Sequence, residues 1–275
     1  MIRGLYTAAS GMLAGERRQE VLSNNLANVN TVGYKKDDSV MRSFPEMLLY
    51  SLNDHTGSGP QRLDPNSPSV GAVGTGAFLE EIITRFTPGT LKPTKNQFGF
   101  AIVDSSANPL QRSFFPMADQ EGNTFLTRDG DFHPDSQGFL VNGAGFYLQA
   151  VGTDGKPVAN SRVRVNNEGT PIPGLMENGE FAENAAGLRF DLVHVANVEK
   201  LQNVGGGRFR FQEDNLTTDR SGEMRQGFLE GSNVDLAEAM TDMIAVMRNY
   251  EANQRVIRVL DSTLDKAVNQ LGRLG

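Results

Sequence analysis

Apolar residues in the C-terminal part of the chain recur at alternating steps of four and three positions. The stripe contains Leu236, Met240, Met243, Met247, Tyr250, Ile257, Leu264, Val268 and Leu271, and only Gln254 and Asp261 interrupt it. A heptad repeat of this length keeps one face of a helix against partner helices. Neither Gly nor Pro occurs between Leu236 and Leu271. The sequence therefore predicts one long helix with a packing seam, which we call the heptad stripe.

The residues just before this stripe are typical of a helix start. Ser232 or Asn233 can accept hydrogen bonds from the first free amides, and Val234 follows them. Asp235 places a carboxylate where the helix dipole is positive. We therefore expect the C-terminal helical segment to cover residues 232–275.

The N-terminus carries a weaker form of the same rhythm. Its apolar positions are Ile2, Leu5, Ala9 and Met12, followed after an interruption by Leu22, Leu26 and Val29. Three glycines within this stretch each cost about 1 kcal/mol in a helix interior relative to Ala. We predict a helical segment over residues 1–34 that forms when a partner covers its apolar face.

The middle of the chain has a different character. Gly, Pro, Ser and Asp dominate residues 53–76, so we assign 35–76 to a linker or extended arm. Short apolar runs separated by turn dipeptides follow, and they predict a mostly antiparallel β domain over 77–231. The predicted strands are 78–86, 98–103, 125–128, 139–141, 146–150, 162–165 and 188–195. The predicted class is thus α+β, with the terminal helices pairing as a coiled coil and the β domain inserted between them.

Composition excludes several functional classes. The 275-residue chain contains no Cys, which excludes disulfide frameworks, thiol nucleophiles and thiolate zinc sites. Its net charge of −7 argues against a binder of nucleic-acid backbones. No apolar run reaches the roughly 18 residues of a membrane span. The N-terminal stretch is a poor signal-peptide core, so we expect no cleaved leader.

Candidate chemistry is concentrated in one acidic segment. Asp129, Asp131, His133 and Asp135 alternate along a predicted hairpin, but the Gly and Glu that a calcium loop needs are replaced by Pro134 and Leu140. Acidic turn residues are the preferred interpretation, and a metal-dependent module or secreted enzyme is the alternative. His55 and His194 have no visible nucleophile beside them. We expect no catalytic, cofactor-binding or metal-binding residue and no small-molecule substrate.

Two long signatures at opposite ends of the chain carry a resemblance. Residues 23–35, SNNLANVNTVGYK, resemble the N-terminal signature of the flagellar basal-body rod and hook protein family. Residues 226–235, QGFLEGSNVD, resemble the stretch that opens the family's C-terminal helix, and RNYEAN at 248–253 continues it. Residues 86–96, 127–132 and 138–141 resemble landmarks of its β domain. The segment 104–116 departs from the family pattern, since its Phe pair comes late.

The resemblance implies a structural protein of the rod, closest to the distal rod type. Such a subunit is exported unfolded by the flagellar export apparatus, without a cleaved leader, and assembles outside the cytoplasmic membrane. It binds copies of itself and other rod or hook axial proteins, and the tube so formed transmits torque. The predicted assembly residues are Ile2, Leu5, Met12, Leu22, Asn25, Leu26, Asn28, Asn30, Thr31, Gly33, Tyr34, Ser232, Asn233, Val234, Asp235, Leu236, Met240, Met243, Met247, Tyr250, Ile257, Leu264, Val268 and Leu271.

Overall fold

The computed structural model describes most of the chain, namely residues 2–50, 69–106, 108–166, 169–177, 180–183, 187–219 and 222–271. It divides into two compact units. Unit 1 comprises Met1–Asn24, Asp38–Ile83 and Ala237–Gly275, and unit 2 comprises Asn25–Asp37 and Thr84–Leu236. The chain is α+β, as the sequence predicts, with one helix towards each end and antiparallel strands between them.

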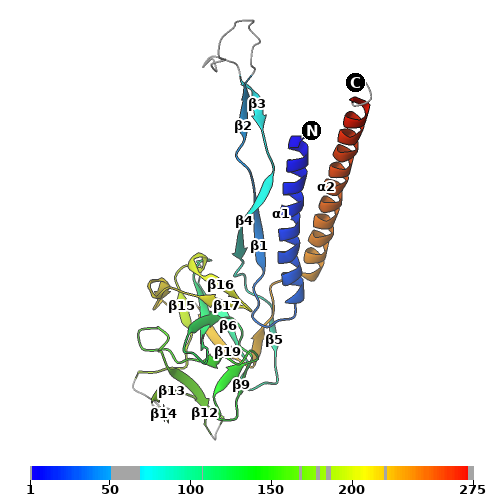
Figure 1. Cartoon of the computed structure of the whole chain (residues 1–275). Helices are drawn as coiled ribbons and strands as arrows, with labels where there is room; N and C mark the ends of the chain where they lie inside the picture. Colours follow the sequence, from blue (N-terminus) through cyan, green and yellow to red (C-terminus); the bar gives the residue numbers. More distant parts are fainter. Residues whose placement is uncertain are drawn as a thin grey trace. The chain divides into compact units, whose positions relative to one another are not determined.

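Two helices and an extended ribbon form unit 1 (Figure 1). Helix α1 spans Ile2–Ala27 and helix α2 spans Leu236–Leu271. They run antiparallel, because Gly4 lies nearest Leu260 and Gly15 lies nearest Val246. An ion pair of 3.5 Å joins Arg18 to Asp242 further along the same face. None of the helices in the described part of the chain is long and apolar enough to cross a membrane.

The glycines of α1 let the two helices approach closely. A Cβ on Gly4 would lie 3.3 Å from the Leu260 side chain, and one on Gly11 would lie 2.9 Å from the Asn253 amide nitrogen. These contacts follow a heptad step on both helices, since 4 and 11 face 260 and 253. The residues that weaken α1 as an isolated helix are therefore its contact positions with α2.

The ribbon occupies part of the segment that the sequence assigns to a linker, together with residues 77–84, which the sequence assigns to the β domain. Strand β1 (Asp37–Ser43) pairs with β4 (Ala77–Thr84), and β2 (Met47–Tyr50) pairs with β3 (Ser69–Val73). The ribbon runs beside α1, where the Thr7 hydroxyl donates to the Thr75 carbonyl at 3.3 Å. Residues 51–68 of the predicted linker lie outside the described residues.

Unit 2 is built on one large antiparallel sheet with the order β16-β17-β8-β7-β11-β10-β9, to which β15 and β18 add at β7. These strands are β7 (Arg112–Ala118), β8 (Thr124–Thr127), β9 (Phe132–Pro134), β10 (Leu140–Asn142), β11 (Tyr147–Leu148), β15 (Val193–Val195), β16 (Gln202–Gly205), β17 (Arg208–Arg210) and β18 (Leu216–Thr217).

Smaller sheets and two short 3₁₀ turns complete unit 2. The pairs are β5 (Leu91–Pro93) with β20 (Phe228–Glu230), β6 (Phe100–Asp104) with β19 (Gly222–Gln226), and the set β12 (Ser161–Val165), β13 (Pro171–Glu177) and β14 (Glu180–Glu183). The 3₁₀ turns cover Val198–Lys200 and Glu213–Asn215.

Aromatic residues fill two apolar clusters on either side of β7. Phe115 and Met117 belong to one cluster with Phe132 and Leu148, whereas Phe114 belongs to the other. Adjacent residues of a strand point to opposite faces, so β7 supplies both clusters at once. This strand is the most continuously buried in unit 2 among those described, with six of its seven residues fully buried.

Strand β7 escaped the sequence prediction because of Pro116. A proline inside a run argues against a central strand, since it cannot donate to the ladder. Here the neighbour of β7 changes beside Pro116, from β15 opposite Arg112–Phe114 to β11 opposite Met117–Ala118. The Pro116 carbonyl still accepts from the Gln149 backbone N–H at 2.9 Å. The unusual segment 104–116 therefore begins at the end of β6 and includes the first five residues of the central strand, 112–116.

Candidate assembly site

Three segments that are far apart in the sequence meet inside unit 2. The Gly33 N–H donates to the Glu230 carbonyl at 2.7 Å, and the Lys36 N–H donates to Asn233 Oδ1 at 2.7 Å. Asn233 Nδ2 in turn donates to the Arg85 carbonyl at 2.7 Å and to Thr87 Oγ1 at 2.8 Å. The chain that follows α1 and the chain that precedes α2 are thus bonded to each other and to the β domain. We call this meeting point the junction.

Five charged side chains lie at the junction, and we call them the junction network. Lys35 Nζ lies 2.5 Å from Glu230 Oε1 and also donates to the Thr87 carbonyl at 2.9 Å. Arg128 places one nitrogen 3.5 Å from Glu230 Oε2 and another 2.7 Å from Asp104 Oδ2. Arg112 Nε lies 3.4 Å from the same Asp104 oxygen. Three cations and two carboxylates therefore alternate through the interior.

Burial makes this network sensitive to the loss of one charge when its partner stays in place. The side chains of Lys35, Arg128 and Glu230 are at most 1% exposed. Burial lowers the pKa of the Lys35 ammonium, while the Glu230 carboxylate opposes that shift. Breaking a buried ion pair by removing one partner typically costs about 3–5 kcal/mol, because the other charge stays uncompensated. The network therefore holds the junction segments together only while each buried cation keeps its carboxylate partner.

Two glycines permit the close approach of backbones at the junction. Gly33 has a φ of +67°, and a Cβ there would overlap the backbone of Arg128. A Cβ on Gly89 would overlap the carbonyl group of Gly231. Larger residues at either position would separate the segments that the hydrogen bonds join.

Asn25 and Tyr34, two predicted assembly residues, are buried within unit 2. Asn25 Nδ2 donates to the Asp37 carbonyl at 2.7 Å, and its Oδ1 accepts from the Asp37 N–H at 2.9 Å. The Tyr34 hydroxyl donates to the same Oδ1 at 3.1 Å. Burial raises the pKa of the Tyr34 phenol to about 12, and the Asp37 carboxylate adds to the effect. Both side chains thus order the chain after α1.

The remaining predicted residues near the helix ends have mixed positions. The Thr31 hydroxyl donates to Asn28 Oδ1 at 3.1 Å, and Asn30 is exposed. Ser232 Oγ accepts from the Val234 N–H at 3.2 Å. Since Ser232 and Asn233 both bond before α2 begins, neither caps that helix as the sequence suggested. Asp235, directly before Leu236, occupies the capping position.

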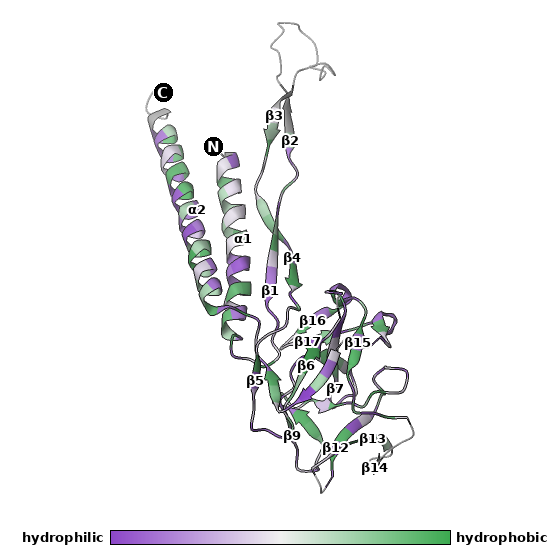
Figure 2. Cartoon of the chain, turned by 180° about the vertical axis from the view of Figure 1, so that it is seen from behind, coloured by the Kyte–Doolittle hydropathy of each residue, from purple (hydrophilic) through white to green (hydrophobic). Residues whose placement is uncertain are grey.

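The heptad stripe of α2 lies largely at the surface of the single chain. Leu236, Met240, Met247, Tyr250 and Val268 are exposed, with exposed fractions from 36% to 69%, whereas Met243, Ile257 and Leu264 are half-buried. The α2 residues that lie against the glycines of α1 are Val246, Asn253 and Leu260. Figure 2 shows hydrophobic and hydrophilic residues alternating along both helices. An apolar face of α2 is therefore left uncovered by α1.

The corresponding α1 residues are partly covered. Leu5, Met12, Leu22 and Leu26 are half-buried, while Tyr6 and Leu13 are exposed. The side chains of Ile2 and Leu271 lie outside the described residues.

The acidic hairpin uses its carboxylates for turns. Asp129 Oδ1 accepts from the Asp131 N–H at 3.1 Å, and Asp135 Oδ1 accepts from the N–H groups of Gln137 and Phe139 at 2.8 and 2.9 Å. Asp131 accepts from the Asn96 amide at 2.9 Å. In the described part of the chain, no three His, Asp or Glu side chains are grouped to hold a metal ion. Turn formation accounts for this segment.

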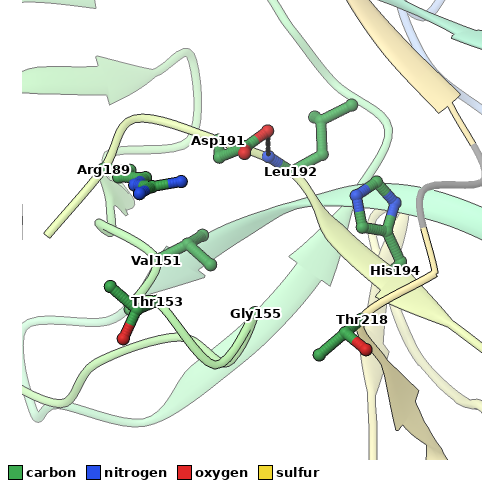
Figure 3. Close-up of a pocket in the computed structure, with 9 residues that line it drawn as sticks. Val151, Thr153, Gly155, Arg189, Asp191, Leu192, His194 and Thr218 are labelled. Carbon is green, nitrogen blue, oxygen red and sulfur yellow. Dashed lines mark hydrogen bonds between the residues drawn. The ribbon is translucent and has the colours of Figure 1, made fainter. Parts of the chain in front are cut away.

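His194 forms a buried pair with Ser113 on the neighbouring strand. Its Nδ1 lies 2.9 Å from Ser113 Oγ, and both residues are at most 4% exposed. His194 borders a pocket of about 80 Å³ with Arg189, Asp191 and Thr218 (Figure 3). Ligand pockets usually measure about 300–1,000 Å³. The pair links β7 to β15, and the pocket beside it is smaller than a usual ligand site.

Sequence reasoning missed Lys35, Asp104, Arg128 and Glu230. Three of them stand in the quoted family segments, at 23–35, 127–132 and 226–235. Single charged residues are usually solvated, and nothing in the local pattern shows that these are buried. The available signal was the presence of opposite charges in separate signature segments.

Comparison with known proteins identifies three family models along the chain. Residues 5–35 match the model described as flagella basal body rod protein, and residues 225–271 match flagellar basal body rod FlgEFG protein C-terminal. Residues 112–173 match flagellar hook protein FlgE/F/G D1 domain. The first two models include the junction residues Gly33, Lys35, Glu230 and Asn233, and the third covers part of the large sheet.

Curated relatives match over essentially the full length. The flagellar hook-basal body complex protein FlhO of Bacillus subtilis is 32% identical, with 100% of both chains covered. The flagellar basal-body rod protein FlgG of Buchnera aphidicola (strain Bp) is 30% identical over 97% of this chain and 98% of its own. FlgG of Bacillus subtilis is 27% identical over 98% and 99%. The chain belongs to the flagellar basal-body rod and hook protein family.

Proposed function

We propose that this protein is a structural subunit of the bacterial flagellar basal-body rod that self-assembles through its terminal helices. The observation that carries the proposal is the exposed heptad stripe of α2. Met240, Met247 and Tyr250 lie uncovered on a helix whose other face already contacts α1. Burying these side chains against other subunits supplies about 25 cal/mol per Å² of apolar surface.

The two faces of α2 favour assembly into an open tube. Contacts at Gly4, Gly11 and Gly15 are compatible with α1 and α2 pairing as an antiparallel coiled coil. The second face then meets a different surface on the next subunit. When the rotation that relates one subunit to the next does not close a ring, such a heterologous contact builds an open helical filament.

The remaining features of the proposal follow the family. The subunit travels unfolded through the flagellar export apparatus without a cleaved leader, and it assembles outside the cytoplasmic membrane with other rod and hook axial proteins. The chain has no Cys, which fits export in an unfolded state. In the assembled tube, contacts with neighbouring subunits take the place of disulfides. Its role is to transmit torque from motor to hook, which requires no catalysis.

Charging the centre of the heptad stripe tests the proposal. Met247→Asp places a carboxylate in the contact and is expected to abolish incorporation into basal bodies and motility, while unit 2 stays folded. Asn249→Asp is the matched control, since it adds the same charge at an exposed position of α2 off the stripe. The amount of the variant in isolated basal bodies measures incorporation, and swimming assays measure motility. Normal motility of the Met247→Asp strain would overturn the packing argument.

A further inference from the structure

Glu230 lies in the segment that leads to α2, and its carboxylate bonds to the segment that follows α1 and to the β domain. Its Oε1 accepts from Lys35 Nζ at 2.5 Å and from the Gly89 N–H at 3.1 Å, while its own backbone carbonyl accepts from Gly33. Gly33 follows the end of α1 at Ala27 by six residues, and Glu230 precedes the start of α2 at Leu236 by six residues. The junction therefore ties the two segments at equivalent distances from their helices.

We propose that Lys35, Glu230 and Asn233 are positioning residues for assembly, and that their bonds form a latch that holds the segments entering and leaving the β domain at one fixed point. With the latch closed, the chain leaves unit 2 towards α1 and towards α2 from two adjacent, ordered positions. The proposal rests on the function proposed above, because its consequence is correct assembly of the terminal helices. It assigns to the junction a role separate from the seam on α2.

The chemistry of the latch favours positioning over simple stabilisation. A buried ion pair can often be replaced by apolar residues with little loss of stability, so stability alone does not require one here. Directional bonds are what the pair adds. Lys35 Nζ bonds to Glu230 and to the Thr87 carbonyl at once, and the adjacent Lys36 N–H bonds to Asn233. Several such bonds, all inside unit 2, fix the direction of the 33–37 backbone.

A double variant separates positioning from charge compensation. Lys35→Met/Glu230→Met removes one cation and one anion, and Arg128 keeps its 2.7 Å bond to Asp104. No buried charge of the pair is left alone, so the large sheet of unit 2 should remain folded. The single variant Lys35→Met removes the nearer cation of the Glu230 carboxylate and leaves only Arg128 at 3.5 Å, so it should destabilise unit 2 as well.

Backbone amide hydrogen exchange of the purified full chain measures whether the junction bonds of the latch are formed. In the double variant, the amides of Gly33, Lys36 and Arg85, which bond within the junction, should exchange about tenfold faster or more. Amides of the β7–β8 ladder should keep their protection. Incorporation into basal bodies should be lost in cells. Arg42→Met/Glu80→Met, which removes an exposed ion pair of unit 1, is the matched control and should change neither readout.

Asn233→Ala provides a second test that leaves every buried charge in place. It removes the bonds to Lys36, Arg85 and Thr87, and should speed exchange of the Lys36 amide and impair assembly with unit 2 folded. Should the double variant fail to fold, this variant decides the matter.

The outcomes separate the latch from the seam. Normal assembly of the folded double variant, or normal assembly of Asn233→Ala, overturns the latch. If the latch is overturned in this way but Met247→Asp still abolishes assembly, the proposed function stands without the latch. If Met247→Asp also assembles normally, the proposed function itself fails.

Discussion

At the scale of single residues, polar side chains define where the β domain begins and ends. Asn25 and Tyr34 were predicted from the family signature as assembly residues, and the structure shows each bonded inside its own unit. Their role in assembly remains a prediction, and it is now an indirect one, through the order of the chain after α1. The sequence could not reveal the roles of Lys35 and Asn233 either, because their partners lie 195 and 197 positions away.

Tyr34 offers a residue-scale prediction about pH. Its pKa in the folded protein is about 12, raised by burial, against roughly 10 in an unfolded chain. Between these values the unfolded state loses its proton while the folded state keeps it, so the contribution of Tyr34 to stability is complete below pH 10 and is lost as pH rises towards 12. The slope is about 1.4 kcal/mol per pH unit.

The measurement compares wild type with Tyr34→Phe in denaturant unfolding from neutral to alkaline pH. At neutral pH the wild type should be more stable by about 1 kcal/mol, the value of a hydrogen bond such as that to Asn25. That advantage should shrink as pH rises above 10. Comparing the two proteins cancels the contributions of other groups, including Lys35. A constant difference over this range contradicts the burial of the phenol.

At the scale of elements, the terminal helices were predicted more accurately than the strands. The heptad spacing predicted a helix over 232–275 and the structure has α2 at Leu236–Leu271, while 1–34 corresponds to α1 at Ile2–Ala27. A long period-3.6 pattern is averaged over many residues, whereas a strand of three or four residues offers little periodicity. The 98–103, 125–128 and 162–165 runs correspond to β6, β8 and β12, but β7 was missed through Pro116.

The contact face between the helices was harder to predict. Sequence reasoning treated Gly4, Gly11 and Gly15 only as weak points of α1, yet all three face α2. The α1 glycines lie against Val246, Asn253 and Leu260 of α2, which stand beside the predicted heptad stripe. Small residues permit close approach without being apolar markers, so a hydrophobicity pattern alone does not find them.

Gly11→Leu tests this close approach at the element scale. The new side chain meets Asn253, whose amide nitrogen would already lie 2.9 Å from a Cβ at position 11. Overpacking of this kind costs about 1–3 kcal/mol, while helix propensity favours Leu over Gly by roughly 1 kcal/mol. We therefore expect α1 to gain helicity by circular dichroism and yet to separate from α2.

Disulfide trapping measures that separation, since the chain has no Cys of its own. In a Gly15→Cys/Val246→Cys background, oxidation should link α1 to α2, because a Cβ at position 15 would lie 3.9 Å from the Val246 side chain. Adding Gly11→Leu should slow the linkage about tenfold. Ala9→Leu adds similar bulk at an exposed position of α1 and should leave the rate unchanged. Equal rates in both would argue against the glycine contact.

At the scale of the whole molecule, the division into two units predicts how the chain responds to proteases. Unit 2 contains both large apolar clusters, while unit 1 consists of two helices with exposed apolar faces and an exposed ribbon. Little buried area offsets the ordering entropy of the helices in a dilute monomer. From the sequence alone, we expect rapid loss of residues up to about Tyr34 and after about Asn233.

The junction changes the expected products of limited proteolysis of the dilute monomer. Cleavage within α1, the 38–83 ribbon and α2 should leave a peptide containing Asn25–Asp37 bound to a fragment of 84–236, because Lys35 and Gly33 bond to Glu230 and Lys36 bonds to Asn233. The two pieces should elute together in size-exclusion chromatography and separate only in denaturant, as mass spectrometry of each peak would show. In Lys35→Met/Glu230→Met the peptide should dissociate after cleavage.

Helices that resist digestion in the monomer would contradict coupling of folding to assembly, and loss of the 25–37 peptide from the wild-type core would contradict the junction. A stable 84–236 core that retains the 25–37 peptide would show that the contacts that fold unit 2 form in the monomer, before the contacts that join subunits.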